Sequence, residues 1–398
     1  MIDIDAARAD TPACQDQVFL DSAGSSLPPE PVLREVIDHL HREAEIGGYR
    51  AAAERGDDLT DGYAVFARLL GCRPEEVAFT DSATRSWLAL LDSVPLGAGD
   101  RILISEVEYA GNAVALMRLA ELTGAEVTLV RSDDAGALSV DALRAVLDER
   151  VKLVSLVHVP TNTGLVNPVR EVADAAHEVG ALVLLDACQS VGQLPVRMDE
   201  LGVDMLSGTG RKWMRGPRGT GFLAVRQEVR ERLWPRLIDH SGAPWLTPTT
   251  YRLHDDARAF ELWEYGVAER LGLIAATRYA LDLGVDEVEA AVADRAGRLR
   301  SGLAAVAGVQ VRDIGHRHGG IVTFTVDGVA ADDVRRALGR AGVTVTVSSR
   351  ASSRIDMTRR GLDAVVRASP HYFVSPQQVD EAVAAVRAVV ETGGATGA

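Results

Sequence analysis

Two residues in the middle of the chain have the types and the spacing to do chemistry together. Lys212 lies on a loop of small residues, directly before the glycine-rich run at residues 215–221. Asp186 comes 26 residues earlier and ends the apolar run at residues 181–185. A lysine amine can condense with an aldehyde, and a carboxylate can keep an aromatic ring nitrogen protonated so that the ring accepts carbanion electrons. The pair predicts a pyridoxal 5'-phosphate (PLP) site, and the alternative for Asp186 is a helix-capping aspartate.

A candidate anion-binding turn follows the strand-like run at residues 77–80. Ser82, Ala83 and Thr84 open a segment of helical spacing, so free backbone N–H groups and the positive end of a helix dipole would face an anion there. We expect this turn to bind the cofactor phosphate. The alternative is an ordinary helix N-cap.

The composition predicts a globular protein without nucleic-acid or membrane partners. The 398 residues are 47% hydrophobic and 25% charged, which is enough for two domains and a sizeable core. A net charge of −15 opposes binding to nucleic acid and to anionic membranes, because both carry the same sign. Cys14, Cys72 and Cys188 are far apart and lack metal-ligand spacing, so we expect no metal site and a cytoplasmic location.

Short apolar runs alternate with segments of helical spacing over most of the chain. The helical segments, such as residues 139–148 and 168–179, predict repeated βαβ units. We therefore expect an α/β fold with a mainly parallel, seven-stranded sheet flanked by helices. The candidate strands are residues 77–80, 102–105, 126–130, 153–158, 182–186, 203–207 and 221–225.

The pattern changes near residue 285 and predicts a smaller α+β domain at the C-terminus. We expect an N-terminal segment (residues 1–30) that packs with the small domain, a large PLP-binding domain (residues 31–284) and the small domain itself (residues 285–398). The elements expected in the small domain are helices at residues 285–307, 331–341 and 376–391 and strands at residues 320–325 and 344–347.

The residues around the lysine and the aspartate resemble the class V aminotransferase and cysteine desulfurase-like family of PLP fold type I. In that family a strand ends in Asp-Ala-x-Gln, and a later strand leads into Ser-x-x-x-His-Lys and a Gly-Pro-x-Gly-x-Gly turn. This chain has Asp-Ala-Cys-Gln at residues 186–189, Ser207 and Lys212 at the matching spacing, and the glycine turn at residues 216–221. The resemblance implies PLP as the cofactor and a homodimer with the active site near the subunit interface.

The resemblance also implies further cofactor contacts. Thr209 occupies the position of a second phosphate-binding hydroxyl, Tyr109 that of a catalytic aromatic residue that stacks on the ring, and Gln189 that of an amide bound to the phenolic oxygen. Outside this context, a tyrosine at a strand end is a core or rim residue and such a glutamine is solvated. Arg211 replaces the usual histidine, and its permanent charge would favour the neutral amine of Lys212 and could bind the phosphate.

Three residues are implied on the substrate side. Arg367 matches the arginine that binds the α-carboxylate of an amino acid through both arms of its guanidinium; without the match it would be a surface ion pair. Asn162 is a candidate contact to the substrate or to the phenolic oxygen, although the best alignment puts Thr161 at the family position. Tyr49 ends a segment similar to one that approaches the substrate in lyases of ergothioneine-type pathways.

One departure from the family bears directly on the reaction. Cysteine desulfurases carry a nucleophilic cysteine on a loop of the C-terminal domain, but the equivalent residues 347–356 include no cysteine. We therefore expect no persulfide on that loop and no desulfurase activity. The loop carries Arg350 and Arg354 instead, which would either recognise a second anionic group on the substrate or form a solvated basic loop.

These observations predict a PLP-dependent C–S β-lyase that acts on an S-substituted cysteine, either a conjugate or a sulfoxide. Lys212 would remove the Cα proton, and elimination of the sulfur substituent would give pyruvate and ammonia. The resemblance is to hercynylcysteine sulfoxide lyases and to cysteine-conjugate lyases of natural-product pathways. The alternatives are a class V aminotransferase, an isopenicillin N epimerase-like racemase, a decarboxylating enzyme, a cysteine desulfurase and a non-catalytic protein with the same fold.

Overall fold

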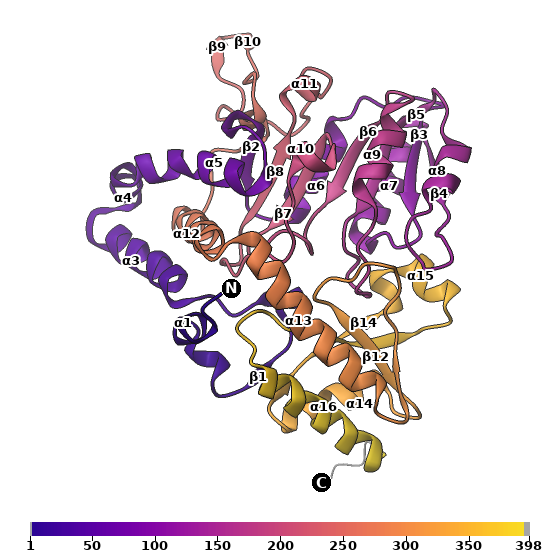
Figure 1. Cartoon of the computed structure of the whole chain (residues 1–398). Helices are drawn as coiled ribbons and strands as arrows, with labels where there is room; N and C mark the ends of the chain where they lie inside the picture. The colour runs from indigo at the N-terminus through magenta and orange to yellow at the C-terminus, as the bar shows by residue number, and fades with distance from the viewer. Residues whose placement is uncertain (1, 394–398) are drawn as a thin grey trace.

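A seven-stranded sheet forms the core of the larger part of the molecule, with the strand order β2-β8-β7-β6-β5-β3-β4 (Figure 1). The computed structural model describes residues 2–393. All neighbouring strands are parallel except β8, which runs antiparallel to β2 and β7. The predicted mainly parallel α/β sheet is confirmed. Its strands are β2 (Val77–Thr80), β3 (Arg101–Ser105), β4 (Glu126–Val130), β5 (Val151–Val157), β6 (Leu182–Asp186), β7 (Met205–Thr209) and β8 (Gly221–Val225).

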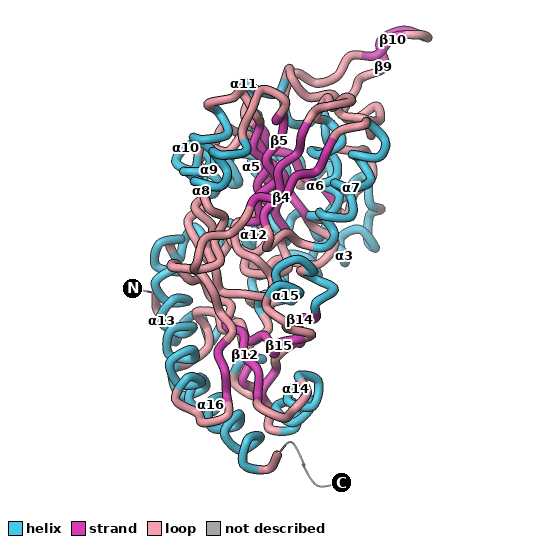
Figure 2. Tube along the Cα trace, turned by 90° about the vertical axis from the view of Figure 1, so that its right-hand side faces the viewer, coloured by secondary structure: helices cyan, strands magenta, loops and turns pink. Residues whose placement is uncertain are grey.

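Helices cover both faces of this sheet, and the side chains of each strand alternate between the faces. Leu182 and Leu184 of β6 belong to the core cluster that includes Trp87. Val183 and Leu185 belong to the core cluster on the other face. Figure 2 shows α6 and α7 on one side of the strands and α8, α9 and α10 on the other. These helices are α6 (Ala83–Ser93), α7 (Ala110–Thr123), α8 (Val140–Val146), α9 (Val169–His177) and α10 (Met198–Leu201).

The carboxyl ends of the parallel strands lie at one edge of the sheet, where ligands bind in such folds. Strand β6 ends at Asp186, and the segment after β3 carries Tyr109 as the N-cap of α7. Strand β7 leads into the loop that carries Lys212. The sheet therefore delivers side chains from three strands to the same edge.

A second sheet of four strands, in the order β11-β12-β15-β14, forms the core of the C-terminal part. Its strands are antiparallel. Strands β11 and β15 and helix α15 were not predicted, and the predicted strand at residues 344–347 is two strands, β13 and β14. The elements are α13 (Val285–Ala304), β11 (Val309–Val311), β12 (Val322–Val326), α14 (Ala331–Arg340), β13 (Val343–Thr344), β14 (Thr346–Ser349), α15 (Arg354–Arg359), β15 (Ala364–Ala368) and α16 (Pro376–Glu391).

The N-terminal segment crosses between the two sheets before it forms an arm of helices (Figure 1). Strand β1 (Val18–Phe19) pairs in parallel with β13. Helix α13 begins directly after Gly284, which ends α12, but the division into segments 1–30, 31–284 and 285–398 stays a prediction. Within residues 2–393, no helix is long and apolar enough to span a membrane. The remaining helices and the hairpin are α1 (Ile4–Ala9), α2 (Ser22–Ser25), α3 (Glu30–Ile46), α4 (Gly48–Glu54), α5 (Gly56–Leu70), α11 (Gln227–Arg230), α12 (Val267–Leu283), β9 (Trp245–Thr247) and β10 (Thr250–Tyr251).

Candidate active site

Lys212 lies in the loop after β7, where packed groups surround its amine. Burial lowers the pKa of Lys212, and the nearby charge of Arg211 acts in the same direction. A lowered pKa increases the fraction of neutral amine, which is the nucleophilic form. The sequence holds a single other lysine, Lys152, and it lies in β5 with its amine bonded to a surface carbonyl. Lys212 is therefore the one lysine that can react at this edge.

A strained turn fixes the loop that follows the lysine. Arg215 has a φ of 59°, in the left-handed region that non-glycine residues rarely adopt, and its N–H donates to the carbonyl of Lys212 at 2.9 Å. Its buried guanidinium donates to the carbonyl of Leu27, the hydroxyl of Tyr372 and the hydroxyl of Thr11. These contacts with distant segments hold the strained conformation and keep Lys212 in position.

Asp186 is buried at the end of β6, and both of its carboxylate oxygens accept hydrogen bonds. Oδ1 accepts from the N–H of Cys188 at 3.0 Å, and Oδ2 accepts from the side-chain amide of Asn112 at 2.9 Å. The same Asn112 amide donates to Oε1 of Glu108 at 3.0 Å. Sequence reasoning missed Asn112 and Glu108, although their spacing of four residues at the start of a helix was a usable signal.

The turn at the start of α6 has the features of an anion site. Ser82 is the N-cap of α6, and its Oγ accepts from the N–H of Arg85 at 3.2 Å. The serine side chain therefore acts as an ordinary helix cap. The N–H groups of Ala83 and Thr84 find no acceptor among residues 2–393 and remain free for an anion. A Cβ added to Gly221 would lie 2.3 Å from the backbone of Ser82. The absence of a side chain at Gly221 therefore allows β8 to pack directly against the turn.

Thr209 and Gln189 are already engaged by the protein. The hydroxyl of Thr209 donates to the carbonyl of Thr220 at 3.4 Å, a long contact that a phosphate oxygen can replace. Gln189 donates from Nε2 to the carbonyl of Ala23 at 3.0 Å and accepts at Oε1 from the indole of Trp213 at 2.9 Å. These bonds fix the Gln189 amide, so its role toward the phenolic oxygen of PLP stays a prediction.

Tyr109 is the N-cap of α7, and Arg211 directly precedes the lysine. Tyr109 as a residue is 43% exposed, and its ring lies over Gly111, where an added Cβ would come within 2.8 Å of the ring. An aromatic face that remains this open is available for stacking. The guanidinium of Arg211 donates to the carbonyl of Gly24 and so points toward the N-terminal segment.

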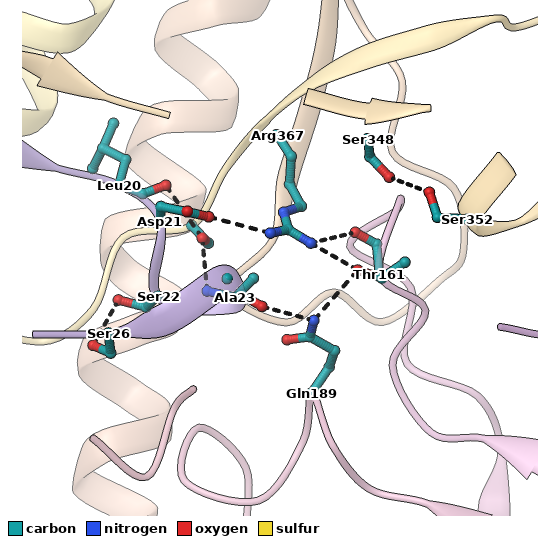
Figure 3. A network of polar contacts seen from close by, with 12 residues as sticks. Leu20, Asp21, Ser22, Ala23, Ser26, Thr161, Gln189, Ser348, Ser352 and Arg367 are labelled. Atoms are coloured by element: carbon teal, nitrogen blue, oxygen red, sulfur yellow. Dashed lines mark hydrogen bonds and ion pairs between the residues drawn. The ribbon is translucent and has the colours of Figure 1, made fainter. Parts of the chain in front are cut away.

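On the substrate side, Arg367 of β15 is buried with 8% exposure and contacts segments far away in the sequence (Figure 3). Its Nη1 donates to Oγ1 of Thr161 at 2.7 Å, and its Nη2 donates to Oδ1 of Asp21 at 3.2 Å. Thr161, which the family alignment favoured over Asn162, is thus the residue that contacts the arginine. Sequence reasoning missed Asp21, because no local pattern marks a contact across 346 residues.

Polar atoms without partners remain in this arginine and in Asn162, the chain neighbour of Thr161. Within residues 2–393, Nε of Arg367 and both amide atoms of Asn162 are buried and have no hydrogen-bond partner. An unsatisfied buried polar group costs about 1–3 kcal/mol, so such a group calls for a ligand or water. The free arginine donor suits the carboxylate of an amino acid.

Tyr49 lies away from the lysine in the single chain. It is 84% exposed on α4 and lines a cavity of about 810 Å³ between the helical arm and residues 261–270. Its predicted role at the substrate stays a prediction.

The segment that replaces the desulfurase loop is tied down by ion pairs. Arg350 pairs with Asp363 at 2.6 Å, and just beyond the segment, at the end of α15, Arg359 pairs with Glu106 of the segment after β3 at 3.2 Å. These pairs favour a structural role for the basic loop over recognition of a second anionic group. Arg354 is exposed. The segment contains no thiol.

The donor set fits PLP. A lysine amine whose pKa burial lowers, a fixed carboxylate, free N–H groups at a helix start and an open aromatic face come from separate elements to one edge of the sheet. At Gly221 the backbone of β8 lies directly against the turn at Ser82 and Ala83. This close approach supports the backbone N–H groups that would bind the phosphate.

Comparisons with known proteins agree with this geometry. A family model described as aminotransferase class V matches residues 18–382. A cysteine desulfurase from Haloferax volcanii is 30% identical, over 98% of this chain and 97% of the relative. A probable cysteine desulfurase 2 from Mycobacterium leprae is 33% identical, over 97% and 96%. The apo structure of a cysteine desulfurase from Thermococcus onnurineus NA1 has a TM-score of 0.90 at 25% identity, over 98% of each chain. The fold is PLP fold type I, and PLP is the cofactor.

These matches overturn the prediction of a C–S β-lyase for S-substituted cysteines. That prediction rested on a loop without cysteine and on a short similarity at Tyr49. The relatives that match nearly the whole chain are named cysteine desulfurases, and the matches do not show the expected nearness to conjugate lyases or epimerases. A missing side chain in one loop is a weaker indicator of substrate than similarity along the full length.

Proposed function

This chain belongs to the class V aminotransferase family, and from that premise we propose that it removes sulfur from L-cysteine, as the name of its relatives states. The observation that carries the proposal is the free, buried Nε of Arg367, a residue whose Nη1 contacts Thr161, the chain neighbour of the unpartnered Asn162. That donor set suits the α-carboxylate of a small amino acid. The name of the relatives supports cysteine as that amino acid.

Each residue of the site has a task in this proposal. When bound, PLP supplies the electron sink for the charge that develops at Cα. Arg367 binds the carboxylate and thereby sets which bond at Cα faces the lysine. Lys212 accepts the Cα proton at Nζ, because burial lowers the pKa of its amine and so favours the neutral form. Asp186 holds the proton of the ring nitrogen through a carboxylate that two donors have already oriented.

The sulfur acceptor in this proposal is a thiol outside the chain. Burial raises the pKa of all three cysteine thiols: that of Cys14 rises, that of Cys72 rises to about 12, and that of Cys188 rises well above its usual range. All three thiols are therefore neutral and poor nucleophiles. In the overall reaction, L-cysteine and an external thiol give L-alanine and the persulfide of that thiol. The Cβ–S bond breaks, an S–S bond forms, and the acceptor proton passes to the alanine product.

The proposal includes a homodimer and a cytoplasmic location. Large apolar side chains are exposed on α3 and on the β9–β10 hairpin, and a monomer rarely leaves so many uncovered. They are Leu33, Ile37, Leu40, Trp245, Leu246 and Tyr251. All three cysteines are unpaired, which is typical of a reducing compartment.

The test is product analysis with L-cysteine and purified, PLP-loaded protein. We expect L-alanine to form at a rate that depends on added dithiothreitol, with sulfide released as the dithiol reduces its own persulfide. The Lys212→Ala variant is the control and makes no alanine. Pyruvate and ammonia in place of alanine, or no turnover of cysteine, would contradict the proposal.

A further inference from the structure

Glu108 is a buried carboxylate beside the cofactor site that the proposed reaction does not use. It directly precedes Tyr109, and its side chain accepts three hydrogen bonds. Oε1 accepts from the backbone N–H of Tyr109 at 2.9 Å and from the side-chain amide of Asn112 at 3.0 Å. Oε2 accepts from the hydroxyl of Ser155 at 2.9 Å. A buried carboxylate with this many donors has a fixed orientation.

The amide of Asn112 joins Glu108 to the residue that binds the ring nitrogen. Its single Nδ2 donates to Glu108 and, at 2.9 Å, to Oδ2 of Asp186. An amide nitrogen has two hydrogens, so both N–H hydrogens of the Asn112 side chain are donated to the two carboxylates. Two like charges therefore lie on either side of one side chain in a buried region, 78 residues apart in the sequence.

We propose that Glu108 is a positioning residue for PLP. Through Asn112 it holds the Asp186 carboxylate in the orientation that meets the ring nitrogen, and its own negative charge adds to that of Asp186 in keeping this nitrogen protonated. The inference rests on the cofactor and its site, so it holds whichever amino acid is the substrate.

The surroundings of Glu108 favour the charged form when the cofactor is present. Its three donors and the start of α7 stabilise the carboxylate, while burial and the charge of Asp186 oppose it. Burial raises the pKa of Glu108 to about 7. The other titratable or charged groups of the site are the amine of Lys212, whose pKa burial lowers, the guanidinium groups of Arg211 and Arg367, the neutral thiol of Cys188, and His158, whose pKa burial lowers to about 3. A cationic ring nitrogen would shift Glu108 further toward its charged form.

The experiment compares Glu108→Gln with Glu106→Gln. A glutamine at 108 can accept from Tyr109 and Asn112 and donate to Ser155, so it keeps the hydrogen bonds and removes the charge. Glu106 is the matched control, because it lies two residues away and is also buried, but pairs with Arg359. The readout is the ¹⁵N chemical shift of PLP labelled at the ring nitrogen, followed against pH in the loaded proteins without substrate.

We expect the ring nitrogen of Glu108→Gln to lose its proton at a pH lower by on the order of one unit, since an opposite charge is lost at short range in a buried site. Glu106→Gln should match the wild type. A Glu108→Gln protein that binds PLP and titrates like the wild type would overturn the proposal, because a purely structural role leaves the ring nitrogen unchanged.

A second variant keeps the proposal testable if Glu108→Gln fails to fold. Ser155→Ala removes one donor to Glu108 and leaves the contacts of Asp186 intact. It makes Glu108 easier to protonate, so the ring nitrogen should again release its proton at lower pH, by less than in Glu108→Gln. An unchanged or upward shift in Ser155→Ala would contradict the role of Glu108.

Discussion

The cofactor end and the substrate end of the site differ in how completely the protein satisfies its own polar groups. At the cofactor end, the carboxylates of Asp186 and Glu108 and the amide between them have partners within the chain. At the substrate end, Nε of Arg367 and the Asn162 amide are buried without any partner within residues 2–393. The chain therefore orients the groups around the ring nitrogen in advance, whereas its substrate contacts, like the N–H groups of Ala83 and Thr84 at the phosphate turn, are left to be completed by a ligand.

This difference predicts that changes at the two ends of the site affect different properties of the enzyme. Preorganised groups at the cofactor end act on the charge that develops during the reaction, so changes there should affect turnover and the ionisation of the site. Unsatisfied groups at the substrate end gain partners on binding, so changes there should affect affinity. Four variants test this separation.

The largest effect is expected at the cofactor end from Lys212→Ala. It removes both the amine that condenses with the cofactor and the group that accepts the Cα proton, so kcat should fall by about 10⁴-fold. Lys152→Ala, which changes the remaining lysine, is the control and should keep its activity. Steady-state assays and the visible absorbance of bound PLP measure the outcome. Retention of both by Lys212→Ala would refute the assignment of the lysine.

The pH dependence of stability tests whether the polar groups of the cofactor end are as buried as the structure has them. Burial raises the pKa of Glu108 from 4.5 to about 7 in the folded chain. A raised folded-state pKa gives a stabilisation that is complete below the unfolded pKa and is lost as the pH rises through the folded value. The apo wild type should therefore lose roughly 3 kcal/mol of unfolding free energy relative to Glu108→Gln between about pH 4.5 and pH 8.

Urea unfolding of both proteins at the two ends of this pH range measures that difference. Other titrating groups are common to the two chains and cancel in the comparison. A difference that stays constant with pH would show that Glu108 titrates normally, and the cofactor end would then be more open to water than the structure has it.

At the substrate end, Arg367→Lys should weaken binding more than turnover. A lysine keeps the charge but cannot form two parallel hydrogen bonds with a carboxylate, so KM for L-cysteine should rise by about 100-fold, with a smaller change in kcat. Arg354→Lys, an exposed change in the same part of the chain, is the control. A fall in kcat at constant KM would place Arg367 with the cofactor groups and remove the distinction between the two ends.

The smallest effect is expected from Asp21→Asn. Asp21 occupies one Nη of Arg367 and competes with the substrate carboxylate for it; burial raises the pKa of Asp21, against the effect of the arginine. Removal of this charge should lower KM by about 3- to 10-fold, on the order of 1 kcal/mol. Asp16→Asn, an exposed change in the same segment, should have no effect. A higher KM in Asp21→Asn would mean that Asp21 orients the arginine for the substrate.

The sequence by itself determined the large sheet and the elements that carry the main chemistry. The predicted bounds of β2, β4, β6 and β8 agree with the structure, because each is a short run rich in apolar or β-branched residues. The spacing of Asp186 and Lys212 likewise identified the cofactor, since one residue ends strand β6 and the other lies in the loop after the neighbouring strand β7. Strand β15 escaped prediction because Arg367 interrupts its apolar run.

Only the tertiary structure decided which residues surround those groups. Asp21 meets Arg367, Asn112 meets Asp186, and Arg215 holds the lysine loop through contacts with Leu27 and Tyr372. Local patterns report which face of an element is buried, whereas these contacts join segments that are distant in the chain and are fixed by how the strands and the two sheets pack together. The physical reason is that periodicity encodes burial, while the pairing of buried polar groups depends on the whole fold.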